Sequence, residues 1–190
     1  MFDQLMAEDY QNGANGWQHK LDKELKRGLK IKIWAKRLEN GHDMSRAAYN
    51  MPNVTMQQVE SFINEFDKKN TDPYVESMTV LARDEVHKYG TLTRIITKIP
   101  MMTKRESIMA MKRKELPNGE LCYLMNTVEH PDFPRNNQYV RIDWFKGMVC
   151  SPKPDGSVDV VEFMQFDMGG YFPTSMLNMI QTKAVTEETQ

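Results

Sequence analysis

The sequence predicts an α+β fold in which an antiparallel sheet is followed by a single helix at the C-terminus. Apolar residues recur at every second position through most of 78–167, which is typical of strands. Tight-turn residues separate these segments, as in an antiparallel meander. After Pro173 the apolar spacing changes to that of a helix. A sheet finished by one helix can enclose a cavity, and the content of that cavity would decide the function.

The composition narrows the class of protein. A length of 190 residues suits one compact domain. The formal charge is -1, from 25 basic and 26 acidic residues. The protein therefore lacks the net positive charge with which many proteins attract nucleic acid, and no nucleic-acid partner is expected. No segment approaches the roughly 18 apolar residues of a membrane-spanning helix. Residues 1–6 lack the pattern of a signal peptide, and we expect a cytoplasmic protein.

The sulfur-containing residues add two expectations. Cys122 and Cys150 lie in apolar, strand-like runs without zinc-site spacing, so we expect buried free thiols and no metal or other cofactor. Sixteen methionines are unusual for an ordinary domain, and methionine suits surfaces that accept variable apolar shapes. The alternative for any one of them is ordinary core packing. One group stands out in the sequence: Met101, Met102, Met109, Met111 and Met125.

The N-terminal part is predicted to contain helices and two strands. A short helix is expected over 1–11. A second is expected over 17–27, because Trp17, Leu21 and Leu25 are spaced by four residues. Strands are expected over 29–39 and 44–51, where apolar and polar residues alternate.

A further helix has a clear start in the sequence. Thr55 can cap the amide of Gln58, while the Gln58 side chain reaches back to Thr55. Its predicted buried stripe is Val59, Phe62, Ile63 and Phe66. Asp72 and Pro73 would open another short helical turn, which completes a helix pair.

The remaining elements are strands and the last helix. The six strands are expected near 78–88, 91–99, 105–115, 120–128, 138–149 and 157–167. The apolar face of the final helix is Met176, Leu177, Ile180 and Ala184. No boundary divides the chain, which we expect to comprise an extension over 1–16 and one domain over 17–190. The fold is therefore one sheet of about eight or nine strands gripping one long helix.

Four motifs suggest a family. They are KIPM at 98–101 followed by RESI at 105–108, VEHPDFP at 128–134, YVRI at 139–142, and DMGGYFPTSMLN at 167–178. In this order and spacing they resemble the START lipid-transfer domains, over roughly 17–182, and the phosphatidylcholine-transfer branch looks nearest. The resemblance implies a helix-grip fold, in which a curved antiparallel sheet wraps around the C-terminal helix. It also implies a tunnel for one lipid and no catalysis.

Two departures from the family pattern bear on the ligand. The resemblance places Arg105 where phospholipid-binding members have a basic headgroup contact. Glu106 replaces the usual Asp. Met111 stands where members often carry a second Arg, and sterol carriers use a buried charge there. A phospholipid is therefore the expected ligand, and a sterol is the alternative.

Strand alternation places Arg105, Ser107, Met109 and Met111 on one face, which offers a charged end for a phosphate and a soft wall for acyl chains. The alternative for Arg105 is an ion pair with a carboxylate at the surface. Trp144 could stack against a quaternary ammonium group, or it could be a core residue. The complete set of predicted lipid contacts is Arg105, Ser107, Met109, Met111, Tyr123, Met125, Trp144, Met164, Phe166, Met176, Leu177 and Ile180.

Contact with a membrane is expected to be transient, during lipid exchange. The candidates are the basic run Lys112–Lys114 and apolar residues beside the last helix, including Tyr171 and Phe172. A solvated charge run is the alternative for the first.

Two other functions remain open. One is a cyclase or hydrolase that uses the same cavity, for which Glu162 is the one inward-facing titratable residue that the pattern suggests. No catalytic grouping can be recognised from the spacing of the four histidines. The other is a ligand-sensing or scaffolding module whose cavity is filled by its own side chains.

Overall fold

A computed structural model describes residues 11–24, 28–65, 73–83 and 90–170. The chain packs into two compact units, which are described in turn. The first comprises Met1–Val59, Arg113–Leu124 and Phe145–Phe166, and the second comprises Glu60–Lys112, Met125–Trp144 and Asp167–Gln190. The described part contains no helix with the length and apolar character that crossing a bilayer requires.

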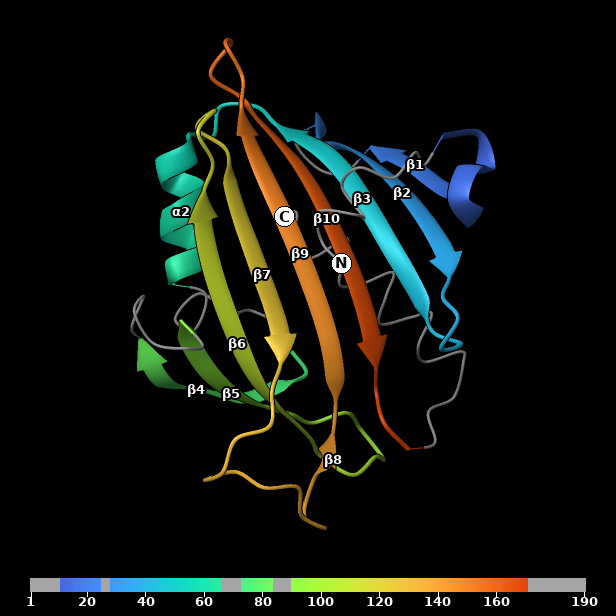
Figure 1. The fold of residues 1–190 in the computed structure, drawn as a ribbon, viewed down its shortest axis with the longest axis vertical. Coiled ribbons are helices and arrows are strands. Elements are labelled where there is room, and N and C mark those ends of the chain that lie inside the picture. The colour runs from blue at the N-terminus through green and yellow to red at the C-terminus, as the bar shows by residue number, and fades with distance from the viewer. Residues whose placement is uncertain (1–10, 25–27, 66–72, 84–89, 171–190) are drawn as a thin grey trace. The chain divides into compact units, whose positions relative to one another are not determined.

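The described elements are mostly strands (Figure 1). In chain order they are η1 (Gln11–Gly16), β1 (Gln18–Glu24), β2 (Lys30–Arg37), β3 (Asp43–Met51), α2 (Met56–Asn64), β4 (Val75–Arg83), β5 (Thr91–Thr97), β6 (Arg105–Glu115), β7 (Leu121–Thr127), β8 (Val140–Arg141), β9 (Asp143–Pro152) and β10 (Val158–Asp167). Hydrogen-bonded neighbours follow the order β1-β2-β3-β10-β9-β7-β6-β5-β4, and β8 pairs with β6. The predicted antiparallel sheet is confirmed, and the described residues contribute ten strands to it where about eight or nine were expected.

In the first unit, register gives the sheet two distinct faces. Antiparallel pairing sets Glu162 of β10 opposite Ala47 of β3, and Ala47 opposite Ile33 of β2. Opposed residues in a ladder share a face, so these three side chains lie on the same side. Figure 1 shows β3, β10 and β9 running side by side.

The other face of this unit carries an aromatic core. Trp17 and Phe163 are fully buried, with ring centroids 6.0 Å apart. Met44 and Val149 complete the buried cluster. The guanidinium of the buried Arg46 lies over the ring of Phe163, at 5.8 Å from its centroid. This face is filled by the protein's own side chains.

The second unit contains the pairs β4–β5 and β5–β6, both antiparallel. Thr93 lies opposite Met109, and Leu92 opposite Ala110. Leu92, Ile108 and Ala110 form a buried cluster on one face. A second buried cluster joins Ile99, Ile142 and Met168.

The predicted helix over 17–27 is wrong for its described part, because Gln18–Glu24 forms strand β1. All seven side chains of β1 are exposed, and Leu21 is among them. Among the described residues of this segment Trp17, just before the strand, is the one that is buried, and Leu25 lies outside the described residues. The four-residue apolar spacing therefore did not mark a buried helix face. The backbone hydrogen-bonding groups of this segment pair with β2 instead. This tertiary contact outweighs the local preference for a helix.

The single strand predicted over 138–149 is also wrong, because the chain changes partners within it. The amides of Val140 and Ile142 donate to the carbonyls of Lys104 and Glu106, each at 3.0 Å, which makes β8 a parallel neighbour of β6. From Asp143 the chain becomes β9, whose neighbours are β7 and β10.

Helix α2 confirms the predicted cap. The Gln58 amide donates to Thr55 Oγ1 at 3.2 Å, and the Thr55 amide donates to Gln58 Oε1 at 2.8 Å. The predicted stripe is only partly correct, because Val59 and Ile63 are buried whereas Phe62 is exposed. Phe66, Asp72, the helix over 1–11 and the C-terminal helix lie outside the described residues.

Candidate functional site

Strand β6 is the most deeply buried strand of the second unit. From Arg105 to Ala110 every residue is buried, so side chains on both faces of the strand are removed from solvent. The side chains on the two faces have different contacts. One face packs against other parts of the protein, and the other is a candidate surface for a ligand.

One face of β6 is closed by a charge network. Arg141 Nη2 donates to Glu106 Oε2 at 3.0 Å, with both side chains at most 4% exposed. Arg94 Nε donates to the other oxygen of Glu106 at 2.7 Å. The carboxylate of Glu106 is thus shared between two guanidinium groups.

The same network fixes the segment after β7. Arg141 Nη2 also donates to the carbonyl of Phe133 at 2.7 Å. Arg94 lies over the ring of Phe133 at 5.1 Å, and over that of Tyr139 at 5.6 Å. Phe133 packs against the Leu92–Ile108–Ala110 cluster. This face is occupied by protein, and Arg141 has a structural role in it.

The opposite face of β6 carries Arg105, Ser107 and Met109, all buried. Their register partners on β5 are Thr97, Ile95 and Thr93, so polar and apolar side chains alternate across the face. A surface that mixes one cation, hydroxyl groups and a methionine can accept both ends of an amphiphile.

Arg105 begins this face. Its side chain is buried, which argues against the alternative of an ion pair at the surface. Arg105 Nη1 donates to the carbonyl of Thr103 at 2.6 Å, and burial lowers the pKa of the guanidinium. The guanidinium remains charged at neutral pH, because its ordinary pKa lies far above 7.

The first unit has a corresponding buried face on β7, β9 and β10. On β10, Val160, Glu162 and Met164 are buried on the face opposite Phe163. Glu162 Oε2 lies 3.2 Å from the Nζ of Lys146 on β9.

A buried thiol belongs to the same environment as this ion pair. Burial, followed by the charge of Glu162, raises the pKa of Cys150 to about 12. Cys122 is half-buried, and both cysteines are free as predicted, although only Cys150 is fully buried.

The predicted lipid contacts fall into separate groups. The second unit contains Arg105, Ser107, Met109, Met111, Met125 and Trp144, and the first contains Tyr123, Met164 and Phe166. Tyr123 is fully buried, and Trp144 packs against the Ile99–Ile142–Met168 cluster, as its core alternative would require. Met176, Leu177, Ile180 and the candidate membrane contacts Tyr171 and Phe172 lie outside the described residues. Each contact therefore remains a prediction.

Lys146 is a buried polar residue that the sequence patterns did not single out. The sequence feature that could have identified Lys146 is that it is the one charged residue in the otherwise apolar run from Trp144 to Cys150. Together with Glu162, which the pattern did suggest, it places two opposite charges on one buried face.

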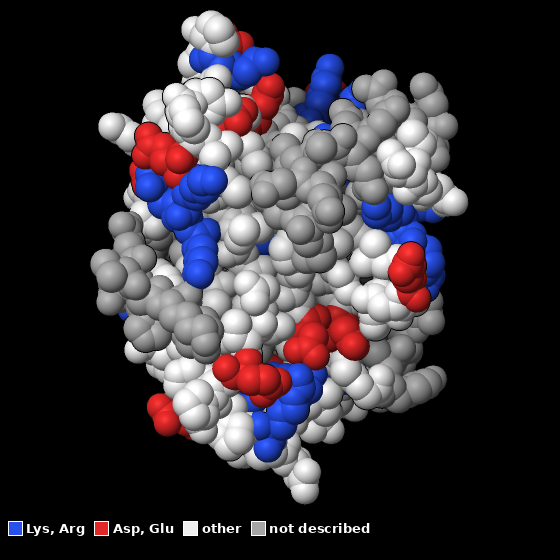
Figure 2. All heavy atoms as spheres, viewed as in Figure 1, with Lys and Arg blue, Asp and Glu red and all other residues white. Residues whose placement is uncertain are grey.

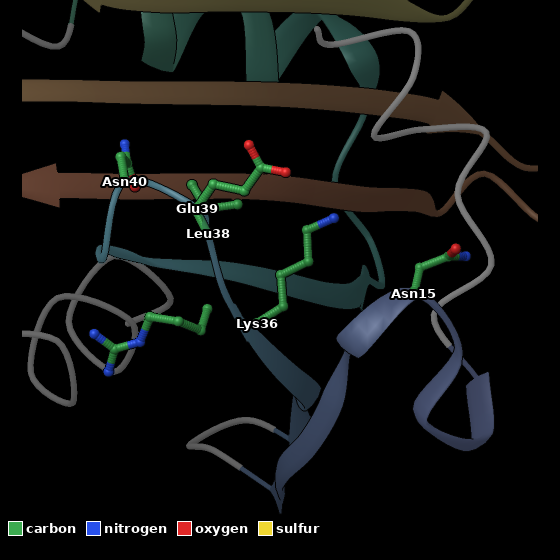
Figure 3. Close-up of a pocket in the computed structure, with 6 residues that line it drawn as sticks. Asn15, Lys36, Leu38, Glu39 and Asn40 are labelled. Atoms are coloured by element: carbon green, nitrogen blue, oxygen red, sulfur yellow. The ribbon is translucent and has the colours of Figure 1, made fainter.

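An open hollow of about 470 Å³ lies elsewhere in the first unit (Figure 3). It is lined by Asn15, Lys36, Arg37, Leu38, Glu39 and Asn40. Lys36 lies over the Trp17 ring at 4.9 Å, and Arg37 pairs with Asp43 at 2.8 Å. None of the predicted contacts lines this hollow, and its charged rim does not suit a lipid chain.

On the face shown in Figure 2, the charged groups of the described residues are mixed rather than segregated. Lys and Arg lie among Asp and Glu there. Lys104 pairs with Glu76 at 2.7 Å, and Arg113 lies 3.5 Å from Glu115. The basic run Lys112–Lys114 is exposed, and its contact with a membrane remains a prediction.

Comparison with solved structures places the fold. The human StAR-related lipid transfer protein 5 superposes with a TM-score of 0.72 at 17% identity, over 97% of this chain and 87% of that one. A STAR-related lipid transfer protein fragment from Xanthomonas axonopodis gives 0.69 at 20% identity, over 91% and 92%. Human STARD10 gives 0.72 at 17% identity, over 90% and 70%.

These likenesses establish the fold of the chain. No curated protein sequence matches it. The START domain sequence profile, however, matches residues 3–187, nearly the whole length. The chain therefore belongs to the START domain family.

Proposed function

We propose that this START domain binds one amphiphilic lipid and carries it between membranes without chemical change. The family assignment supports lipid binding, and two of the similar structures are named as lipid transfer proteins. The ligand would lie between the sheet and the C-terminal helix, as the resemblance implies.

The observation that carries the proposal is the double burial of β6. One face, with Glu106, is filled by Arg141, Arg94 and Phe133. The other, with Arg105, Ser107 and Met109, is equally buried but combines a cation and a hydroxyl with apolar surface. Such a combination suits a ligand with a polar end and a hydrocarbon end.

A phospholipid is the proposed ligand. The fork of Arg105 can donate two hydrogen bonds to a phosphate, and its buried position strengthens them. Met111, half-buried on the same face, supplies no charge where sterol carriers of the family have one. Each buried methylene of an acyl chain contributes about 0.8 kcal/mol, so two chains can be retained without covalent chemistry.

Catalysis is not part of the proposal. A buried Glu162 paired with Lys146 is one titratable couple, and a hydrolase would need further groups converging on a substrate. The described histidines lie in exposed or half-buried positions, with His19 bonded to Asp22 at 2.7 Å. We propose a cytoplasmic protein that contacts membranes only during lipid exchange.

Native mass spectrometry after gentle purification tests the proposal. We expect a species heavier than the polypeptide by the mass of one lipid, and tandem fragmentation should identify a phosphate-containing headgroup. In parallel, the protein should move fluorescent phosphatidylcholine from donor to acceptor liposomes. Protein that carries no lipid after purification, and acquires none from liposomes, would refute the proposed function.

A further inference from the structure

Two buried hydroxyl groups lie on the face of β5 and β6 that carries Arg105, the candidate ligand face of the second unit. Thr93 on β5 is 5% exposed, and Ser107 on β6 is 3% exposed. In the antiparallel ladder Thr93 lies opposite Met109, and Ser107 lies opposite Ile95. Opposed residues of a ladder share a face, so both hydroxyl groups lie on the same side of the sheet as Arg105.

Neither hydroxyl has a hydrogen-bond partner among the residues that the structure describes. The other face of the same two strands is different. There Glu106 accepts a hydrogen bond from Arg94 at 2.7 Å, and the buried cluster of Leu92, Ile108 and Ala110 is apolar. The buried hydroxyl groups of this strand pair therefore lie on the candidate ligand face, and not on the face that protein fills.

A buried hydroxyl without a hydrogen bond is unfavourable, because the group has given up its contact with water and gained nothing in return. Alanine in place of Ser107, or valine in place of Thr93, would fill almost the same space without this cost. Buried polar groups in folded proteins almost always have a partner. A bound ligand that supplies hydrogen-bond acceptors would provide one for each of the two hydroxyl groups.

The order of the side chains along the face indicates which acceptors fit. Arg105, Ser107 and Met109 follow one another on β6 at intervals of two residues, each about 7 Å long. Thr93 is level with Met109. The face thus presents a cation, then a hydroxyl, then a second hydroxyl beside a methionine. A diacyl phospholipid has its groups in the matching order: a phosphate, then the ester carbonyls of the glycerol unit, then the hydrocarbon chains.

We propose that the hydroxyl groups of Ser107 and Thr93 donate hydrogen bonds to the ester carbonyls of the bound phospholipid, an inference that rests on the proposed lipid-binding function. Serine and threonine hydroxyl groups can donate, and a carbonyl oxygen can only accept. Arg105 serves the phosphate, and Met109 contacts the start of an acyl chain. The two hydroxyl groups therefore select lipids with ester-linked chains over lipids with ether-linked chains, which lack the carbonyl oxygens.

The test uses two lipids that differ only in these carbonyls. Liposomes would contain equal amounts of dioleoyl phosphatidylcholine and its dioleyl ether, which have the same headgroup and the same chain length. After equilibration with the liposomes, native mass spectrometry of the protein measures the ratio of the two bound lipids. We expect the wild-type protein to carry about tenfold more ester than ether, the preference that two hydrogen bonds between uncharged groups would give.

The informative variant is T93V/S107A, which removes both hydroxyl groups and keeps the volume and apolar character of the face. It should carry the ester and the ether in nearly equal amounts. The matched control is S77A/T79V, which makes the same two kinds of change at exposed positions of β4, and it should keep the wild-type ratio. The melting temperature of T93V/S107A should not fall, because neither hydroxyl is bonded to the described protein.

The outcomes separate this subsite from the function on which it rests. Equal loading of ester and ether by the wild type, or a preference that survives in T93V/S107A, overturns the subsite even if phosphatidylcholine is still transferred. A marked fall in the melting temperature of T93V/S107A also overturns it, because the hydroxyl groups would then act within the fold. Loss of all lipid binding by the wild type overturns both proposals.

Discussion

Glu106 and Arg141, 35 positions apart in the sequence, meet at 3.0 Å in the interior of the second unit. Arg141 lies on the two-residue strand β8, which pairs in parallel with β6 and sets Arg141 directly beside Glu106. The same guanidinium reaches the carbonyl of Phe133. One side chain therefore connects β6 to the segment that follows β7.

Removing Arg141 should be strongly destabilising. In R141M the Glu106 carboxylate stays buried but loses one of its two guanidinium partners, so we expect the free energy of unfolding to fall by about 3–5 kcal/mol. Urea denaturation measures it. R135M is the control, because Arg135 makes exposed ion pairs with Glu129 and Asp143 and should cost less than about 1 kcal/mol. Equal losses in the two variants would contradict the structural role of Arg141.

Arg105 should determine affinity for phosphate-bearing lipid. In R105M the buried face keeps its apolar area but loses the donor fork, so we expect phosphatidylcholine to bind about tenfold or more weakly. Binding of diacylglycerol should change little. Titration with fluorescent lipids measures both, and R135M should match the wild type. A parallel loss for the two lipids would show that Arg105 acts through the fold and not on phosphate.

Gly169 and Gly170 should differ sharply in their tolerance of alanine. Both have positive φ, 63° and 61°, which costs a non-glycine residue roughly 1–2 kcal/mol. A Cβ on Gly169 would also lie 2.6 Å from the carbonyl oxygen of Arg141, whereas one on Gly170 meets nothing within 4 Å. We expect G169A to lose about 2–5 kcal/mol of stability and G170A about 1–2. Equivalent melting temperatures would disprove the close approach.

The two cysteines should react at very different rates. With a pKa of about 12, Cys150 is roughly one ten-thousandth thiolate at pH 8, and it is buried, so iodoacetamide should modify only Cys122 in the native protein. Peptide mass spectrometry before and after denaturation locates the label. The pKa of Cys150 in the folded protein lies above its ordinary value near 9.0. The thiol's contribution to the free energy of unfolding is therefore fully present below pH 9. That contribution disappears as the pH rises towards 12. Rapid native labelling of Cys150 would contradict its burial.

Short-range patterns predicted local elements well where one face of the element is buried. The alternation over 29–39 predicted β2, and the Thr55–Gln58 box predicted the start of α2, because both depend on contacts within a few residues. Spacing failed at 17–27, where β1 is exposed on both faces and its backbone pairing with β2 decides the conformation. The alternating pattern also missed the break at Ile142, where the chain stops pairing with β6 and the next residue begins β9.

The candidate site was predictable in part for the same reason. Alternation alone separated Arg105, Ser107 and Met109 from Glu106, Ile108 and Ala110, since strand side chains must point to opposite faces. Sequence could not say which face is filled by protein. That depended on Arg141 and Arg94 reaching Glu106 from other strands, and on Phe133 accepting a hydrogen bond from Arg141.

By itself the sequence determined the antiparallel α+β architecture, through two-residue periodicity, and the START family, through four ordered motifs. Tertiary structure alone decided that Lys146 meets Glu162, that Arg105 is buried, and that β1 is a strand. Periodicity is a property of neighbouring residues, so the chain displays it before folding. The burial of a charge and the choice of its partner arise only when distant strands come together, because desolvation and pairing depend on everything that surrounds the side chain.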